Sequence, residues 1–199
     1  MRGRAPIRLL IPVDARADGA EAASILDDLR RGDLGGLARA FDRWHQRVRV
    51  LARRLLSDDA AAEDVVQEVF TALPRAARHF RGEVELETFL LAIAVKRARH
   101  HQRAAARRQR ALARLSDEEP GAPRSPEQEV YRRELGLRLA AALDHLPLRQ
   151  RLAFVLCEIE DLTSAQAAIV AGVPEATVRT RLFHARRRLR AWLGDGGAR

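Results

Sequence analysis

Residues 116–129 divide this chain into two parts and constrain its fold more than any other feature. The stretch contains Pro120, Gly121, Pro123 and Pro126 among acidic residues, so it opposes helix formation and supplies little for a core. On both sides of it, apolar residues recur at spacings of three and four positions, as on one face of a helix. We therefore predict two small helical units joined by a linker.

The composition supports an all-α fold. Hydrophobic residues make up 47% of the chain but aromatic residues only 5%, and runs of the residues that favour strands are missing. The net charge of +9 indicates a polyanionic partner, either nucleic acid or an acidic membrane surface. The single cysteine, Cys157, excludes an internal disulfide and is interpreted as a buried structural thiol, with a redox sensor as the less favoured alternative.

Three helices are predicted in the N-terminal part of the chain. Residues 1–24 lack helical periodicity and are expected to form a loose extension. A first helix begins at Leu34, a second follows the capping residues 57–59 and kinks or ends at Pro74, and a third begins near Leu86. The predicted apolar positions are Leu37, Phe41, Val48, Leu51 and Leu55, then Val65, Val66, Val69, Phe70 and Leu73, then Phe89, Leu90, Ile93 and Ala94.

Residues 163–179 have the spacing of a helix-turn-helix. Small Ala168 lets two helices approach closely, Gly172 suits the turn between them, and Val173 and Val178 fill the angle. The second helix is rich in arginine, as expected of a helix that enters the DNA major groove. An ordinary helical hairpin with a solvated arginine-rich face is the alternative. The predicted helices of this part span about 127–145, 148–160, 163–171 and 174–192.

A second basic segment precedes the linker. Residues 96–114 continue the third predicted helix with basic side chains and no acidic one. Alone, such a run fits a solvated face as well as a nucleic-acid contact, but the helix-turn-helix in the same chain favours the contact. The apolar stretch near the N-terminus is too short and interrupted for a membrane span or signal peptide, so we expect a cytoplasmic protein without membrane insertion.

These residues resemble the extracytoplasmic-function (ECF) sigma factors, the compact two-domain branch of the sigma factor family. The most specific string is Ala-Glu-Asp-Val-Val-Gln-Glu-Val-Phe at 62–70. Two separate matches occur in the order expected for the family and cover about residues 25–192. The remaining matching segments are 31–33, 41, 52–56 and 80–83 in the first part, and 146–151 and 177–186 in the second.

The resemblance implies a sigma factor that binds core RNA polymerase and directs promoter recognition, DNA melting and transcription initiation. It is then not an enzyme and needs no cofactor or metal. The implied division is an extension at 1–24, region 2 at 25–104, a linker at 105–127 and region 4 at 128–193. Region 2 would bind the polymerase and the melted −10 element, and region 4 would bind the duplex −35 element. Members of the family commonly have an anti-sigma protein as a further partner.

The resemblance, together with position on the basic helices, also gives candidate residues. For the coiled-coil clamp of the polymerase's largest subunit they are Asp64, Gln67 and Glu68. For the −10 element they are Phe89, Lys96, Arg99, His100 and Arg103. For the −35 element they are Arg149, Thr177, Arg179, Thr180, Arg181, Phe183, His184, Arg187 and Arg188.

Two of these positions depart from the family's pattern. Lys96 stands where the family usually has Asn, which replaces a group able to pair with a base edge by one suited to a phosphate. His184 stands where Arg is common. Two other functions remain open: a stand-alone helix-turn-helix regulator that binds DNA without polymerase, and, more remotely, an enzyme acting on nucleic acid. The enzyme lacks support because no phosphate-binding loop, nucleophile motif or His pair at helical spacing occurs.

Overall fold

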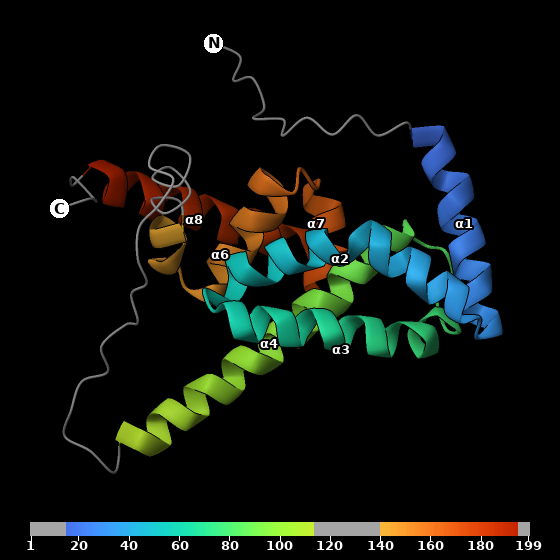
Figure 1. Ribbon diagram of the computed structural model, residues 1–199. Helices are drawn as coiled ribbons and strands as arrows, with labels where there is room; N and C mark the ends of the chain where they lie inside the picture. The colour runs from blue at the N-terminus through green and yellow to red at the C-terminus, as the bar shows by residue number, and fades with distance from the viewer. Residues whose placement is uncertain (1–14, 114–139, 195–199) are drawn as a thin grey trace, which may run out of the picture.

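The computed structural model describes residues 15–113 and 140–194, and every regular element in these two ranges is a helix (Figure 1). The expected all-α fold is confirmed. Within the described residues no helix is long and apolar enough to cross a membrane. The elements are α1 (Ala15–Arg31), α2 (Leu34–Leu56), α3 (Asp59–Ala77), α4 (Leu86–Ala113), α6 (Leu148–Phe154), the π-helix η1 (Val155–Ile159), α7 (Ser164–Ala171) and α8 (Glu175–Gly194), and residues 140–144 are also helical.

The expectation of a loose extension up to residue 24 is wrong for residues 15–24, which belong to helix α1. It begins at Ala15, and Ile25 and Leu29 in its second half are fully buried. Packing of these two side chains stabilises an alanine-rich segment that already favours the helix. Gly36 lets α1 approach α2 closely, because a Cβ at this position would lie 2.5 Å from the Cβ of Asp28. Residues 1–14 lie outside the described residues.

Helix α2 begins and ends where local signals place it, and its buried face matches the prediction at Val48, Leu51 and Leu55 but not at Phe41. Asp33 caps its N-terminus by accepting a hydrogen bond from the Gly35 N–H, and Ser57 ends it in the left-handed conformation. Leu34 and Phe41 are 76% and 41% exposed, so both lie off the core. The true core face, at the same helical period, is Ala40, Trp44, Val48, Leu51, Ala52 and Leu55.

Helix α3 begins after Asp58, whose side chain accepts a hydrogen bond from the Ala61 N–H. Of the two predicted outcomes at Pro74, a kink or an end of the helix, the end is wrong, because the helix continues to Ala77. Proline removes one backbone hydrogen bond there. Leu73 and Ala77 on either side of it are fully buried, and their packing offsets that loss.

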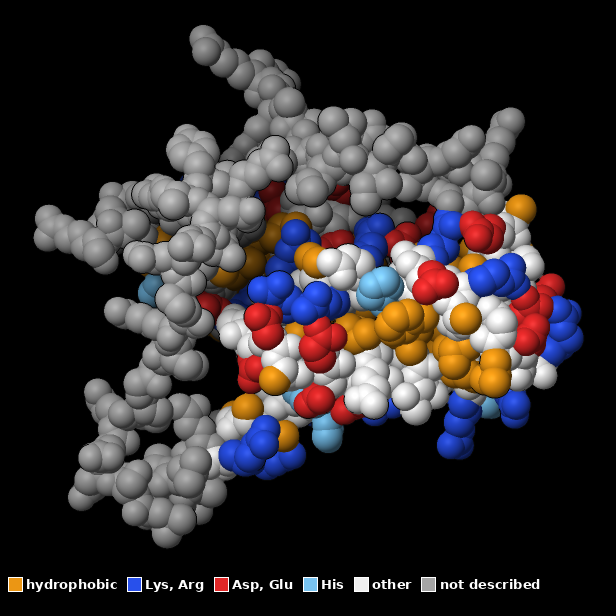
Figure 2. Space-filling model, in the orientation of Figure 1, with side chains coloured by type: hydrophobic (Ala, Val, Ile, Leu, Met, Phe, Trp, Pro, Cys, Tyr) orange, Lys and Arg blue, Asp and Glu red, His pale blue; other side chains and the backbone are white. Residues whose placement is uncertain are grey.

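Helix α4 packs against α2 and α3 through its first half, and its second half projects beyond the bundle (Figure 1). Because it continues to Ala113, the linker cannot begin at residue 105 as expected. Residues 114–139, which include most of the predicted linker, lie outside the described residues. Figure 2 shows charged side chains of both signs over α2 and α3, around an area of hydrophobic side chains.

The helix-turn-helix is confirmed as a structural unit. Thr163 and Gln166 form a capping box at the start of α7, and Gly172 ends α7 with φ +61°. Val178 and Ala168 are buried between α7 and α8. The helix expected over 148–160 is instead α6 followed by the π-helix η1.

Candidate docking face and nucleic-acid interface

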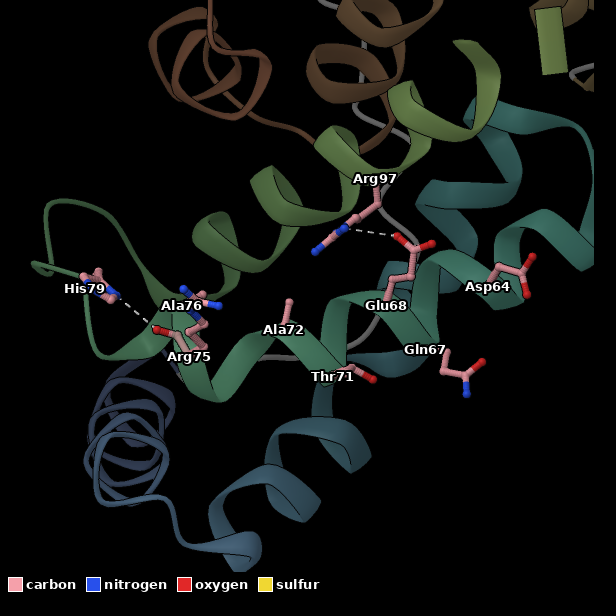
Figure 3. A pocket seen from close by; sticks show the side chains of 9 residues that line it. All are labelled: Asp64, Gln67, Glu68, Thr71, Ala72, Arg75, Ala76, His79 and Arg97. Carbon is pink, nitrogen blue, oxygen red and sulfur yellow. Dashed lines mark hydrogen bonds and ion pairs between the residues drawn. The ribbon is translucent and has the colours of Figure 1, made fainter. Parts of the chain in front are cut away.

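A groove of about 780 Å³ runs along α3 and the adjoining face of α4 (Figure 3). Asp64 and Gln67 are exposed at one end of it, and Glu68 is partly buried. Spacings of three and four residues place these side chains on one face of α3. The side chains that line the groove are Asp64, Gln67, Glu68, Thr71, Ala72, Arg75, Ala76, His79 and Arg97.

Glu68 already has partners on α4. Its Oε1 atom lies 2.9 Å from Nε2 of His101, and its Oε2 atom lies 3.4 Å from Nη1 of Arg97. Figure 3 shows Arg97 reaching across the groove to Glu68, while Asp64 and Gln67 point away from Arg97. The three predicted docking residues therefore share a face, and Asp64 and Gln67 are the more available to a partner. The sequence analysis did not single out Arg97. This residue lies one helical turn before His101 and contacts the same carboxylate.

The residues predicted for the −10 element do not form one cluster on α4. Lys96, His100 and Arg103 are exposed, whereas Phe89 packs its ring against Phe80 with 4.6 Å between the ring centres. Phe89 lies about 15 Å along the helix axis from Arg99, at about 1.5 Å per residue. Lys96, His100 and Arg103 are thus the accessible part of this predicted set.

Arg99 is held against the second unit. Its Nη1 atom donates a hydrogen bond of 2.7 Å to the carbonyl oxygen of Ala171, at the end of α7. The pKa of Arg99 is lowered, first by burial and then by the positive charges of Arg181, Arg103 and Arg149. Arginines predicted for the two different DNA elements are therefore near one another.

The N-terminal part of α8 presents the predicted base-reading residues. Thr180 is exposed, and Phe183 is 62% exposed although it is apolar. Arg179 is exposed and lies 3.5 Å from Glu175 at the start of the helix. On a helix that enters the major groove, the side chains of the first turns face the base edges. Thr177 and Arg181, which are partly buried, line a shallow depression on the same part of α8.

The remaining predicted residues of this set lie around the same helix. Arg187 and Arg188 are exposed further along α8, and Arg149 is exposed on α6. His184 is partly buried with its ring centre 5.5 Å from that of Phe183. At position 184, where the family commonly has Arg, this chain therefore has an imidazole ring beside a phenylalanine ring.

Cys157 is partly buried rather than fully buried as expected. Its pKa is raised, first by burial and then by the charge of Glu158, which is the opposite of what a reactive thiolate requires. Among the described residues, no group of three His, Cys, Asp or Glu side chains could hold a metal ion.

The comparisons with known proteins agree with this architecture. The family model for sigma-70 region 2 matches residues 40–108, and the model for sigma-70 region 4 matches residues 136–189. The chain is 32% identical to RNA polymerase sigma-H factor of Pseudomonas aeruginosa over 174 residues, covering 81% of this chain and 88% of that protein.

Two further similarities extend this finding. The chain is 34% identical to the ECF RNA polymerase sigma factor SigE of Mycolicibacterium smegmatis, covering 81% of this chain and 65% of that protein. The fold is similar to that of the sigma factor RpoE of Bartonella quintana, solved in complex with the anti-sigma factor NepR. The TM-score is 0.62 at 21% identity, covering 79% of this chain and 96% of RpoE.

Proposed function

This chain belongs to the sigma-70 family as an ECF sigma factor, and on that premise we propose which of its surfaces recruit RNA polymerase and read the promoter. ECF sigma factors bind core RNA polymerase and direct transcription initiation from promoters, and this chain has that function. Sigma factors as a class are not catalysts. On this proposal the protein contributes recognition in the cytoplasm, while the chemistry of RNA synthesis belongs to the polymerase.

Docking to the polymerase is assigned to the groove along α3. The observation that carries this assignment is that Asp64 and Gln67 are exposed side by side on a helix whose opposite face, at Val65 and Val69, is fully buried. Core packing explains the apolar residues of the 62–70 string, and partners on α2 and α4 account for Glu63 and Glu68, but neither explains Asp64 and Gln67. A partner surface that accepts a carboxylate and a carboxamide accounts for them.

Promoter contact is assigned to two basic surfaces. The exposed side chains of Lys96, His100 and Arg103 on α4 are proposed to follow the strand backbone at the −10 element. The first turns of α8, with Arg179 and Phe183, are proposed to enter the major groove at the −35 element. An exposed phenylalanine on this helix fits contact with a thymine methyl group.

Run-off transcription with purified core polymerase tests the proposal. Core enzyme alone is expected to give no specific transcript, and addition of this chain is expected to give one of defined length. A stand-alone helix-turn-helix regulator would instead bind promoter DNA equally tightly with and without core enzyme. Equal binding without core, together with no transcript, would support that second function. RpoE of Bartonella quintana was solved with an anti-sigma factor, so such a partner is also proposed for this chain.

A further inference from the structure

Helix α4 continues well beyond the core of region 2. The last buried residue of the helix is Ala98, and none of the side chains described between residues 99 and 108 is buried. The helix nevertheless extends to Ala113, which lies about 22 Å past Ala98 at about 1.5 Å per residue. Figure 2 shows Lys and Arg side chains gathered on this projecting part. The core of region 2 therefore does not account for the length of α4.

The basic side chains of this part follow one face of the helix. Lys96, His100, Arg103 and Arg107 recur at spacings of four, three and four residues, and all four are exposed. At about 100° per residue they fall within an arc of about 60°, so they form one row about 16 Å long. We call these four residues the α4 stripe. Residues 96–113 contain no Asp or Glu, so nothing in this part of the helix neutralises the stripe.

The α4 stripe lacks the carboxylate partners that other cations of region 2 have. Every arginine on α2 forms an ion pair with a carboxylate: Arg39, Arg43, Arg47, Arg49, Arg53 and Arg54. On α4 itself, Arg97 and His101 lie off the stripe and pair with Glu68. Among the described residues no carboxylate pairs with the stripe, and Arg103 donates its Nε hydrogen to the Arg99 carbonyl of its own helix. The positive charge of the stripe is therefore available to a partner.

The helix end does not explain this charge. Cations near a helix C-terminus are favoured by its partial negative charge, but the effect is confined to about the last turn. Arg107 lies six residues before Ala113, and the rest of the stripe lies further away. A straight row of cations on an exposed helix face is instead complementary to a polyanion with regularly spaced charges. The backbone of a nucleic acid has that property.

The surroundings of the stripe favour duplex DNA over a melted strand. Proteins that hold single strands combine a basic surface with aromatic side chains on which the bases stack. Residues 96–113 contain no Phe, Trp or Tyr, so this part of α4 offers phosphate contacts without such a platform. Arg107 also lies one helical turn beyond Arg103, the last residue assigned above to the −10 strand. The stripe therefore continues past the contacts that the melted element needs.

We propose that the α4 stripe holds the phosphates of duplex DNA adjoining the −10 element, without reading its bases, and that Arg107 extends the contact by one helical turn. The inference rests on the proposed function, because that function places region 2 at the −10 element. It adds a DNA contact that is independent of sequence and lies on the part of α4 beyond the core.

Binding of the complex of full chain and core polymerase to a promoter fragment, measured at several salt concentrations, tests the stripe. Arg107→Ala is expected to weaken binding several-fold and to lower the slope of log affinity against log salt by about one unit. The loss should be the same when the base pairs next to the −10 element are changed. Core affinity without DNA should be unaltered, and circular dichroism checks helix content.

The matched control is Arg108→Ala. This variant removes an exposed arginine from the next position, which lies about 100° around the helix from Arg107 and therefore off the stripe. Its salt slope should equal that of the parent chain. Equal slopes for Arg107→Ala and Arg108→Ala would overturn the stripe, because charge alone would then decide binding. A loss of core affinity in Arg107→Ala without DNA would also overturn it, since the partner would be the polymerase.

Neutral methylphosphonate linkages, placed one at a time in the duplex beside the −10 element, locate the contact. At one or two positions the parent complex should lose affinity, and Arg107→Ala should show no further loss there. Additive losses at every position would overturn the proposed contact. Run-off transcription separates these results from the proposed function, because absence of any transcript with the parent chain would count against the sigma role itself. A parent chain that gives a transcript, with an Arg107→Ala variant that keeps the parent salt slope, would overturn the stripe alone.

Discussion

Arg186 of α8 donates both its Nε and Nη2 hydrogens to a single carboxylate oxygen of Glu158, with the Nε contact at 3.1 Å. Glu158 lies in the π-helix, so this pair ties η1 to the recognition helix from within region 4. The guanidinium of Arg186 is therefore already paired with a carboxylate of the same region. The arginines around it, at 187 and 188, are exposed.

The Arg186–Glu158 pair is expected to contribute modestly to the stability of region 4. The two side chains are 47% and 28% exposed, so solvent screens their attraction. A double-mutant cycle with Glu158→Ala and Arg186→Ala, measured by urea unfolding, should give a coupling energy of about 0.5–1 kcal/mol. Arg187→Ala serves as the matched control and should show no coupling to Glu158→Ala. A coupling energy of zero between Glu158 and Arg186 would show that solvent screens the pair completely.

Gly36 is expected to be a tight packing position. An added Cβ would lie 2.5 Å from the Asp28 Cβ and 3.1 Å from the Leu29 nitrogen, both on the neighbouring helix α1. Gly36→Ala should therefore lower the free energy of unfolding by about 1–3 kcal/mol despite alanine's better helix propensity. Gly35→Ala is the control, because its Cβ would meet only the Asp33 side chain, at 3.4 Å. If both variants unfold at the same urea concentration, the helices can separate without cost.

Local signals in the sequence predict much of this fold, and contacts between distant segments account for what they miss. The caps at Asp58 and Thr163 and the turn at Gly172 depend on residues within a few positions, so the spacing reveals them. Pro74 does not end its helix, because Leu73 and Ala77 on either side of it pack in the core. The local sequence pattern does not show this packing.

The candidate sites likewise contain features that the sequence predicts and features that only contacts between distant segments determine. A shared face for Asp64 and Gln67 follows from the helical period alone. The partners of Glu160, by contrast, include Arg54 at a separation of 106 residues, and Glu160 reads in the sequence as one more exposed acid. Arg99 likewise is predicted for DNA because it is basic, but tertiary contact sets its partner.

Loss of the polar groups of the docking groove is expected to weaken binding to core polymerase. Asp64→Ala combined with Gln67→Ala should reduce core affinity by roughly tenfold or more, since about 1.4 kcal/mol corresponds to tenfold. Helix content should not change, because both side chains are exposed. Glu63→Ala, which removes an exposed acid outside the groove on the same helix, is the matched control in a core-binding assay. Unaltered core affinity in the folded double variant would contradict the assignment.

Cys157 is expected to react slowly near neutral pH. Burial raises the pKa of its thiol above the ordinary value of about 8.5, so the native protein holds less thiolate than the unfolded chain. Alkylation by iodoacetamide should be slower in the folded protein than in urea, and should accelerate as pH rises above that value. Because the unfolded thiol loses its proton first, native stability should fall over the same rise in pH. Fast alkylation of the folded protein at pH 7 would instead support the redox-sensor alternative.

The recognition helix is expected to divide into a base-reading part and a backbone part. Arg179 lies in its second turn, where side chains of a groove-bound helix meet base edges, and Arg188 lies beyond, where they meet phosphates. Arg179→Ala should cost about 1–3 kcal/mol on the cognate −35 element and relax preference at particular bases. Arg188→Ala should weaken all sequences alike and lower the salt slope by about one unit.

Promoter binding by the polymerase complex, measured across −35 variants and several salt concentrations, compares Arg179→Ala with Arg188→Ala directly. Each substitution removes one exposed positive charge from the same helix, so their difference isolates position from charge. The 3.5 Å pair of Arg179 with Glu175 must break before Arg179 can reach a base. Glu175→Gln should for that reason keep the base preference while it strengthens binding to every sequence. If Arg179→Ala and Arg188→Ala both give the same sequence-independent loss, α8 contacts phosphates along its whole length and reads no base through Arg179.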